Sequence, residues 1–554
     1  MKDISIWQEA DWIAAIAAVV LGLFLIAGAW AISRPRPEVG GHPKGLYILF
    51  FAEMWERFSY YGMRALLIFY LTKHWLFNDS ASNVIYGAYV SLVYITPVLG
   101  GWIADRYLGQ RKAVLFGAVL LTFGHFFMAF EGTGGQNDPT INIFWMALAF
   151  IIVGSGFLKA NISVIVGQLY SRTDVRRDGA YTIFYIGINV GAAVGVLLAG
   201  YLGETVGWAY GFGAAGIGML LGLVVFVLGK PLLMGRGEPP KPLQKSTEMT
   251  MYGIGLAGIA VMWLLIQYQG VVGWLMLIAG ALLLLYVLRE AFKMPKEPRE
   301  RLFAILFLII LQPVFWGLFE QAGGSLNLFT DRYVDRQGVP ASLFQSINAI
   351  FIILMGPVFA SLWVWMAKKG IEPSTPFKFG LGIVQVGLGF LVFVWGANAA
   401  GPAVLVPVIL VFALYFLHTT GELCLSPVGL SAMNRLSPTH LASLVMGAWF
   451  FATAGGNYVA GMIGAATGGE EGDMTRELTL SVYNQIGWFA VGVGVVVLVV
   501  SPFVKKLMHL DTLSDDDVGD DLEGQAQAGL ENQEAGIHPA TNPPGPGDEP
   551  GRNV

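Results

Sequence analysis

The sequence predicts an all-α protein that crosses a membrane many times, and three observations support this fold class. Hydrophobic residues make up 55% of the 554 residues, charged residues only 13%, and the mean hydropathy is +0.61. Soluble globular proteins have about a quarter of their residues charged. Apolar windows of about 20 residues, the length of helix that crosses a bilayer, recur along the chain as far as residue 504. We therefore expect a polytopic membrane protein and exclude a soluble one.

Fifteen apolar windows, bounded by glycine, proline or charged residues, are the predicted membrane spans. They cover residues 12–33, 46–75, 83–104, 112–131, 141–166, 179–203, 208–229, 250–268, 271–289, 301–330, 342–367, 377–396, 402–426, 439–466 and 480–504. The first window could instead be a signal peptide. We expect a retained helix, because acidic residues precede it and its apolar run exceeds the usual ~7 to 15 residues.

Loops rich in lysine and arginine alternate with loops poor in both, and cytoplasmic loops carry the excess of these residues. The alternation predicts a multi-pass protein of the cell inner (cytoplasmic) membrane, with its N-terminus outside and its C-terminus in the cytoplasm. One outer loop carries Arg332 and Arg336, whose charge we expect Asp331 and Asp335 to offset. From Asp511 onward the chain is acidic and rich in proline and glycine, which predicts a disordered cytoplasmic tail.

Composition and spacing exclude several other classes of function. The formal net charge is −5, so the chain has no basic footprint for nucleic acid. Cys424 is the single cysteine, and no CxxC or HExxH spacing occurs, so the sequence predicts neither a metal site nor a cofactor. An intramembrane peptidase would need such a metal motif, a GxSG-like serine setting or a pair of intramembrane aspartates. We therefore expect no enzyme.

The most informative stretch lies in the window between Gly45 and Trp75, where four ionisable residues interrupt an apolar span. At ~100° per residue, the polar residues fall within an arc of roughly 140°. These residues are Glu53, Glu56, Arg57, Tyr60, Tyr61 and Arg64. A charge at mid-bilayer is unfavourable by at least ~2.5 kcal/mol, so the groups must pair or line a wet cavity. The polar face predicts an ion or substrate pathway.

Two further charges stand alone in apolar spans, Lys159 in the first half of the chain and Glu422 in the second. Each needs a partner, and a permanent structural salt bridge is one interpretation. The other is proton coupling, because desolvation disfavours the charged form of either group once the two separate. His418 stands one helical turn from Glu422, where a polar packing role is favoured over proton carriage. Glu320 and Gln321, near a glycine-rich break, are candidates for an outer gate.

The loop from Gly101 to Lys112 has the pattern GxxxDRxxGx followed by two basic residues, and it resembles the signature loop of the major facilitator superfamily. An ordinary positive-inside loop is the alternative. The resemblance implies two six-helix bundles that open alternately to each side, with a gating loop between two spans. The gating residues would be Gly101, Asp105, Arg106, Gly109, Arg111 and Lys112.

The string ExxERFxYY, from Glu53 to Tyr61, resembles the signature of the proton-coupled oligopeptide transporter family within that superfamily. The similarity extends over about residues 44–508 and includes the strings GFLKANIS from Gly156, FYIGIN from Phe184 and FQSIN from Phe344. The chain departs from the family at Ala160, where the family usually has proline after the lysine. The spans 250–268 and 271–289 are similar to an extra hairpin of bacterial members.

This resemblance implies a major facilitator fold with an inserted helical hairpin and one extra N-terminal helix. Five units follow from it. They are an N-terminal helix and linker (1–44), a first six-helix bundle (45–230), a linker with the hairpin (231–299), a second six-helix bundle (300–508) and the acidic tail (509–554).

The resemblance also implies roles for individual residues. Proton coupling would involve Glu53, Glu56, Arg57, Lys159 and Glu422. Peptide binding would involve Tyr61, Arg64, Tyr94, Lys159, Tyr185, Asn189, Trp316, Asn348, Glu422 and Trp449. Within this set, Arg64 and Lys159 would hold the peptide carboxylate and Glu422 the ammonium group. For each aromatic residue, helix packing or an interfacial position is the alternative.

The expected function is proton-driven import of di- and tripeptides, with peptides, protons and the lipid bilayer as partners. One alternative is a proton-coupled carrier of nitrate or an amino acid derivative, and another is a nutrient sensor that does not transport. The simultaneous presence of Lys159 and Glu422 favours a zwitterion, because a pure anion would not need the acid. The sequence leaves the oligomeric state open.

Overall fold

The computed structural model describes residues 8–171, 174, 176–239, 241–438 and 441–510. Within these residues, fifteen helices have 19 residues or more, and each overlaps one predicted span. They are α1 (Glu9–Ser33), α2 (Lys44–Phe69), α3 (Asp79–Ile103), α4 (Gln110–Met128), α5 (Ile141–Gln168), α6 (Arg177–Thr205), α7 (Trp208–Leu228), α8 (Lys245–Gln267), α9 (Gln269–Phe292), α10 (Lys296–Phe319), α12 (Ser346–Lys368), α13 (Thr375–Ala400), α14 (Ile409–Leu436), α15 (Ala442–Ala466) and α16 (Arg476–Leu507). By length and apolar composition, thirteen segments of the described chain could cross a membrane, and α2 and α15 are not among them.

Short elements connect the long helices. They are the π-helical turns η2 (Tyr70–His74) and η3 (Ala104–Leu108), the 3-10 turns η4 (Lys230–Leu233), η5 (Glu320–Gly323) and η6 (Ala341–Gln345), the helix α11 (Ser325–Tyr333), and the strands β1 (Glu38–Val39), β2 (His42–Pro43), β3 (Val334–Asp335) and β4 (Val406–Pro407). β1 pairs with β2 in antiparallel register, and β3 pairs with β4 in parallel register. The predicted tail from Asp511 onward lies outside the described residues.

The predicted continuous span 301–330 is broken in the structure. α10 ends at Phe319, η5 follows, and α11 starts at Ser325. Glycines allow the break and a close approach to α3, because a Cβ at Gly323 would lie 1.8 Å from the hydroxyl of Tyr86. The break places Glu320 in the interior of the molecule, next to α2.

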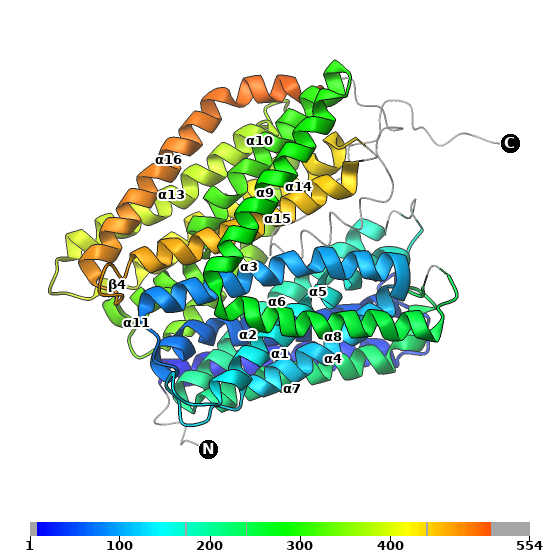
Figure 1. Ribbon diagram of the computed structural model, residues 1–554, viewed down its shortest axis with the longest axis horizontal. Coiled ribbons are helices and arrows are strands. Elements are labelled where there is room, and N and C mark those ends of the chain that lie inside the picture. The colour runs from blue at the N-terminus through cyan, green and yellow to red at the C-terminus, as the bar shows by residue number, and fades with distance from the viewer. Residues whose placement is uncertain (1–7, 172–173, 175, 240, 439–440, 511–554) are drawn as a thin grey trace.

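The helices form two six-helix bundles, α2 to α7 and α10 with α12 to α16, which confirms the predicted fold class (Figure 1). The residue boundaries of the five predicted units stay a prediction. Within the first bundle, α6 packs tightly on α2, since a Cβ at Gly191 or Gly195 would lie within 2.3 Å of the carbonyl oxygens of Met54 or Phe58. These glycines therefore allow α6 to cover α2, the helix with the polar face, at close range.

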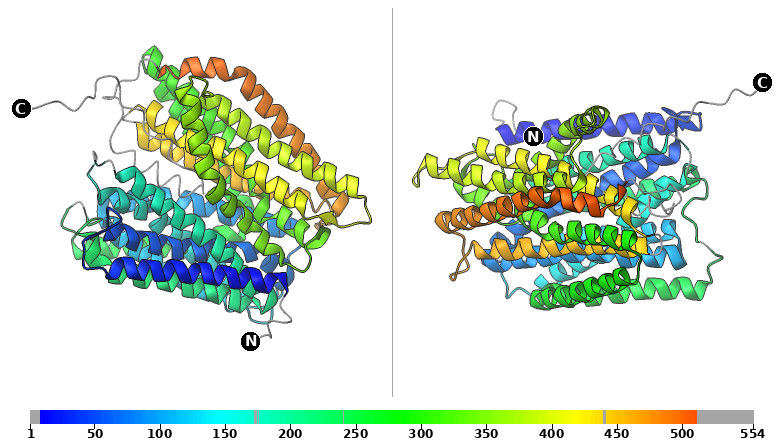
Figure 2. Two further views of the ribbon diagram at one scale, coloured as in Figure 1. Left: turned by 180° about the vertical axis from the view of Figure 1, so that it is seen from behind. Right: turned by 90° about the horizontal axis from the view of Figure 1, so that it is seen from above.

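Three peripheral helices cover the bundles from outside. α1 packs on α2 and α6, where Tyr201 donates a hydrogen bond to Asp11. The hairpin of α8 and α9 lies on the opposite side of the molecule from α1 (Figure 2, right). α8 packs on α3 and α5 of the first bundle, whereas α9 contacts α3 as well as α10 and α15 of the second.

The two bundles converge at the end of the molecule that carries α11 and β4 and diverge toward the opposite end (Figure 1). At the converging end, Arg332 of α11 donates two hydrogen bonds of 2.6 and 2.7 Å to the buried carboxylate of Asp79. The backbone N–H of Met474 donates to the same carboxylate at 2.6 Å. We expected the charges of Arg332 and Arg336 to be offset within their own loop. Arg336 does pair with Asp331, at 2.9 Å, but Arg332 pairs across the interface, because α11 turns this side chain toward the start of α3.

Replacing Arg332 with glutamine should open the converging end. Asp79 would remain buried without its cation, which destabilises the closed arrangement. Because Arg332 itself is one third exposed, we expect this arrangement to lose about 2 kcal/mol, less than for a fully buried pair. Distances between spin labels on α3 and α11 at the converging end should lengthen or broaden. Arg336→Gln makes the same charge change within the second bundle and should leave these distances unchanged. Equal distances in wild type and Arg332→Gln would contradict the closing role.

Candidate functional site

The buried face of α2 carries an ion-pair cluster. Arg57 forms an ion pair with Glu53 one turn before it, and its Nε lies 3.2 Å from an oxygen of Glu56. All three side chains are fully buried. One guanidinium thus joins two carboxylates inside the first bundle, as charge in an apolar interior requires.

Lys159 reaches the same region from α5. Its side chain is 1% exposed, and its Nζ lies 3.8 Å from the ring centroid of Tyr60 and 5.7 Å from that of Tyr94. The carboxylates of Glu53 and Glu56 act on it electrostatically. α5 runs without a break through Ala160, so Lys159 lies on a continuous helix.

Arg64 connects the two bundles. It forms an ion pair with Glu320 of η5, and its Nε donates a 2.6 Å hydrogen bond to the hydroxyl of Tyr86. Both charged side chains are at most 7% exposed. This buried pair lies between the two bundles, where a substrate would have to pass.

Glu422 lies on α14 of the second bundle. It is fully buried and accepts a 2.9 Å hydrogen bond from the amide of Asn348, which also donates to Thr419 at 3.1 Å. Trp316 of α10 is held by its own hydrogen bond, 2.7 Å from the indole nitrogen to the side-chain oxygen of Gln312. These contacts fix the acid and the indole on the second bundle.

A cavity of about 40 Å³ lies between the bundles. Its walls include Tyr61, Arg64, Glu320, Asn348, Tyr415 and His418. At ~10–15 Å³ for each water, the cavity holds two to four water molecules, which is less than a peptide needs. Binding of a larger solute therefore requires the walls to move apart.

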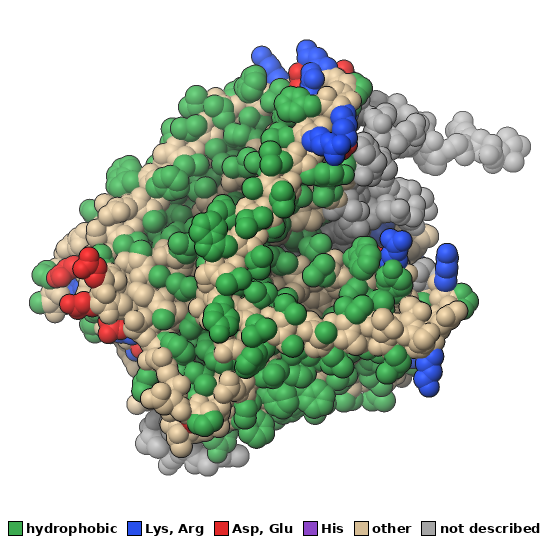
Figure 3. Space-filling model, in the orientation of Figure 1, with side chains coloured by type: hydrophobic (Ala, Val, Ile, Leu, Met, Phe, Trp, Pro, Cys, Tyr) green, Lys and Arg blue, Asp and Glu red, His purple; other side chains and the backbone are tan. Residues whose placement is uncertain are grey.

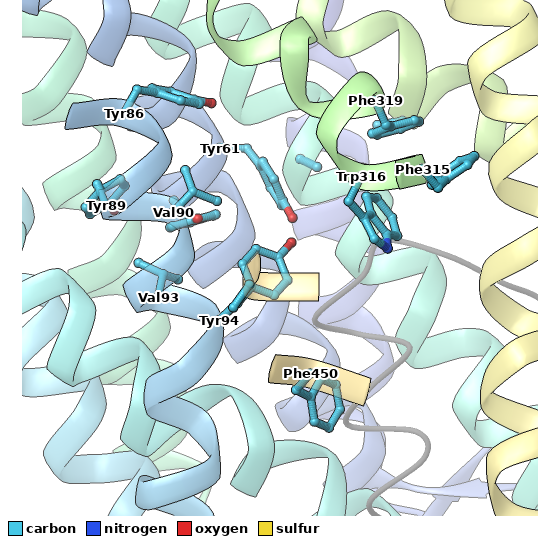
Figure 4. Close-up of a cluster of buried hydrophobic side chains, with 14 of the residues drawn as sticks. Tyr61, Tyr86, Tyr89, Val90, Val93, Tyr94, Phe315, Trp316, Phe319 and Phe450 are labelled. Atoms are coloured by element: carbon cyan, nitrogen blue, oxygen red, sulfur yellow. The ribbon is translucent and has the colours of Figure 1, made fainter. Parts of the chain in front are cut away.

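The structure brings together several of the predicted binding residues. The hydroxyl groups of Tyr61 and Tyr94 point toward one another, and Trp316 lies across from them on the second bundle (Figure 4). Arg64 of the first bundle and Asn348 of the second both line the cavity.

Other predicted binding residues are engaged within their own bundle. Trp449 packs against Phe379, with ring centroids 6.2 Å apart, and against the backbone at Gly429. Asn189 donates to the carbonyl oxygen of Tyr185 on its own helix, at 3.2 Å. Their participation in binding stays a prediction.

The predicted gating loop lies at the diverging end, away from the cavity. Gly109 adopts a φ of +75°, and a Cβ there would lie 2.5 Å from the backbone nitrogen of Pro239, so the position favours glycine. Arg111 pairs with Glu238 at 2.6 Å and holds the pKa of that carboxyl below its ordinary value. Lys112 pairs with Glu248 of α8 at 2.7 Å.

The remaining loop residues contact their neighbours more locally. Asp105 accepts a 2.8 Å hydrogen bond from Gln110, and Arg106 lies 5.9 Å from the ring of Trp102. Gly101 approaches Ala160 of α5. The loop is therefore tied both to its own bundle and to the linker and hairpin, while its gating role stays a prediction.

Sequence reasoning assigned no role in proton coupling or peptide binding to two residues of the site. Tyr86 holds the Arg64 guanidinium, and Tyr60 holds the Lys159 ammonium. Tyr60 was visible on the polar arc of α2. Tyr86 lies two turns before Tyr94 on α3, so a tyrosine face at helical spacing was the available signal.

Known proteins resemble the chain over most of its length. The sequence model of the POT family matches residues 111–475. The peptide transporter YePEPT of Yersinia enterocolitica subsp. palearctica is 38% identical over 469 residues, 79% of this chain and 90% of that protein. The uncharacterized transporter YclF of Bacillus subtilis is 36% identical over 495 residues, 86% of this chain and 97% of that protein. The crystal structure of a mutant of peptide transporter POT in complex with alafosfalin matches with a TM-score of 0.74 and 34% identity, over 87% of this chain and 99% of that chain.

Two six-helix bundles with a charged site between them, together with these matches, define a membrane transporter of the major facilitator type. The chain belongs to the proton-coupled oligopeptide transporter (POT) family. This confirms the resemblance carried by the string from Glu53 to Tyr61.

Replacing Glu320 with glutamine should tighten peptide binding and slow transport. Arg64 would no longer be held by a carboxylate of the second bundle, so a substrate carboxylate meets less competition, and we expect the Kd for dialanine to fall by up to about tenfold. The interface between the bundles would also lose an ion pair, which should slow the movement of the bundles during transport. Kd from calorimetry and uptake rates in proteoliposomes test this, and a weaker Kd would contradict competition for Arg64.

Proposed function

We propose that this protein is a proton-coupled symporter that imports di- and tripeptides by alternating access. One observation supports a zwitterionic substrate. Two buried cations belong to the first bundle, Arg64 in the wall of the cavity between the bundles and Lys159 on α5. One buried acid, Glu422, belongs to the second bundle, where it bonds Asn348 of the cavity wall. A zwitterionic peptide presents a carboxylate and an ammonium group to such a site, and peptides of different length present them at different separations.

The relatives support a peptide substrate. YePEPT is named a peptide transporter, and the peptide transporter POT was crystallised in complex with alafosfalin. In this chain, Tyr61, Tyr94, Tyr185 and Asn189 would hydrogen-bond the peptide from the first bundle. Trp316, Asn348 and Trp449 would bound the side-chain pockets from the second.

Proton coupling would reside in the cluster around α2. Arg57 links the carboxylates of Glu53 and Glu56, and Lys159 lies within their electrostatic reach. Adding a proton to a carboxylate of this cluster would release a cation to another partner, and losing the proton would draw it back. One proton moving inward gains about 2.3 kcal/mol per 100 mV, which at ~1.4 kcal/mol per decade concentrates a neutral zwitterion roughly 50-fold.

The conformation would be inward-facing. Lysine and arginine gather at the diverging end and acidic residues at the converging end on the face seen in Figure 3, which by the positive-inside rule supports a cytoplasmic diverging end. The outer end is then the one closed by Asp79 and Arg332. This assignment puts the N-terminus outside and the C-terminus in the cytoplasm, and leaves the loop from Gly101 to Lys112 to gate the cytoplasmic side.

Uptake of labelled dialanine into proteoliposomes tests the function directly. With an imposed inward proton gradient, we expect accumulation above the level reached without one. Unlabelled dipeptide and tripeptide should compete, whereas free alanine and nitrate should not. Competition by nitrate or an amino acid alone would indicate that this solute, not a peptide, is the substrate. Absence of any uptake by correctly inserted protein would favour a sensor.

Removing the proton-handling groups should separate uphill transport from exchange. In Glu56→Gln or Lys159→Ala protein, we expect gradient-driven accumulation to fall to the level of empty liposomes, because each change removes one charged member of the cluster that links protonation to bundle movement. Counterflow of labelled against unlabelled dialanine should persist in part. Equal loss of both activities would instead assign these residues to binding or folding.

Glu422 should select for a free amino terminus. In Glu422→Ala protein, we expect the affinity for dialanine to fall about 10- to 100-fold, since an ammonium loses its buried partner. The affinity for N-acetylated dialanine should hardly change. Glu470→Ala, in an exposed outer loop, is the matched control. Similar losses for both ligands would contradict an ammonium contact.

A further inference from the structure

The ammonium group of Lys159 lies on the face of an aromatic ring. The distance of 3.8 Å from Nζ to the Tyr60 centroid is short for a cation–π contact, which extends to about 6 Å. Tyr60 is fully buried, and Lys159 is 1% exposed. Desolvation strengthens the attraction between a cation and the negative face of a ring. The contact is therefore of the strong, buried kind.

The surrounding charges explain why a ring is needed there. On α2, Arg57 bonds Glu53 and lies against Glu56, so these carboxylates already share one cation in this conformation. Arg64, also on α2, is paired with Glu320. Glu53 and Glu56 attract Lys159, Arg57 and Arg64 repel it, and the other ring facing it is that of Tyr94 on α3.

We propose that Tyr60 is a positioning residue that holds Lys159 as a buried cation in the inward-facing state, as an alternative to the carboxylates of Glu53 and Glu56. This inference rests on the proposed function. It gives the Lys159 ammonium group a second position, on the Tyr60 ring, besides the one at the carboxylates of Glu53 and Glu56. The ring is neutral, so it accepts the ammonium group without binding a proton itself. Tyr60 stands one turn after Glu56 on α2, so Lys159 can pass between the two by rotating its own side chain.

The inference predicts that the ring face, not the hydroxyl, is required. Tyr60→Phe keeps the face, and Tyr60→Leu removes it while keeping an apolar side chain of similar reach. Without the face, the ammonium form of Lys159 is disfavoured. We therefore expect the alkaline limb of the pH profile of dialanine uptake to move about one pH unit toward lower pH in Tyr60→Leu and to stay in place in Tyr60→Phe.

A double-mutant cycle separates positioning from packing. In a Lys159→Gln background, counterflow of dialanine should have the same pH profile with tyrosine, phenylalanine or leucine at position 60, because the cation is gone. Tyr89→Leu removes another buried tyrosine of the same bundle and should keep the wild-type profile. Thermal unfolding of each purified variant reports on folding. A leucine shift that persists without Lys159, or one that phenylalanine shares, would overturn the proposal.

A second readout does not depend on transport. In protein labelled with 13C at the ε-carbon of lysine, the Lys159 resonance, identified by its loss in Lys159→Gln, should carry an upfield ring-current shift in wild type and Tyr60→Phe. The shift should be absent in Tyr60→Leu. If wild-type protein shows this shift but never accumulates dialanine, the proposed function fails while the contact stands. An unshifted wild-type resonance would overturn the inference itself.

Discussion

Charge in the interior of a membrane protein must be partnered, and the arrangement around α2 follows from that constraint. This helix carries Glu53, Glu56, Arg57 and Arg64, all buried. Three of them pair with one another within two helical turns, whereas Arg64 pairs with Glu320 on the other bundle. The glycines of α6 allow its backbone to cover α2 closely, so these groups are withdrawn from lipid. The polar helix therefore lies at the centre of the first bundle.

The same constraint makes the interface between the bundles switchable. Its ion pairs, the buried Arg64 with Glu320 and the buried Asp79 with the partly exposed Arg332, join residues that belong to different halves. Separation of the halves exposes both members of a pair, and water or a charged substrate can then replace the lost partner. A closed end held by ion pairs can thus open without leaving a buried charge uncompensated. An interface of purely apolar side chains would offer a substrate no such exchange.

The hairpin of α8 and α9 contacts both bundles. α8 is tied to the first bundle by the ion pair of Glu248 with Lys112, at the loop predicted to gate. At the start of α9, the backbone carbonyl of Gln269 accepts a hydrogen bond of 3.1 Å from Tyr458 of the second bundle. The hairpin therefore touches both halves at its two ends. α1, by contrast, packs on α2 and α6 of the first bundle.

The sequence by itself determined the fifteen helices, their fold class and the family, because apolar length and the string from Glu53 to Tyr61 are local properties of the chain. It also identified Lys159 and Glu422 as buried charges, since each interrupts an apolar span. Only the tertiary structure decided their partners. Lys159 meets Tyr60 and Glu422 meets Asn348 across helices distant in sequence, and no local pattern encodes such distances. The pairing of Arg332 with Asp79 was likewise beyond the sequence, because it depends on how α11 turns after the break at Gly324.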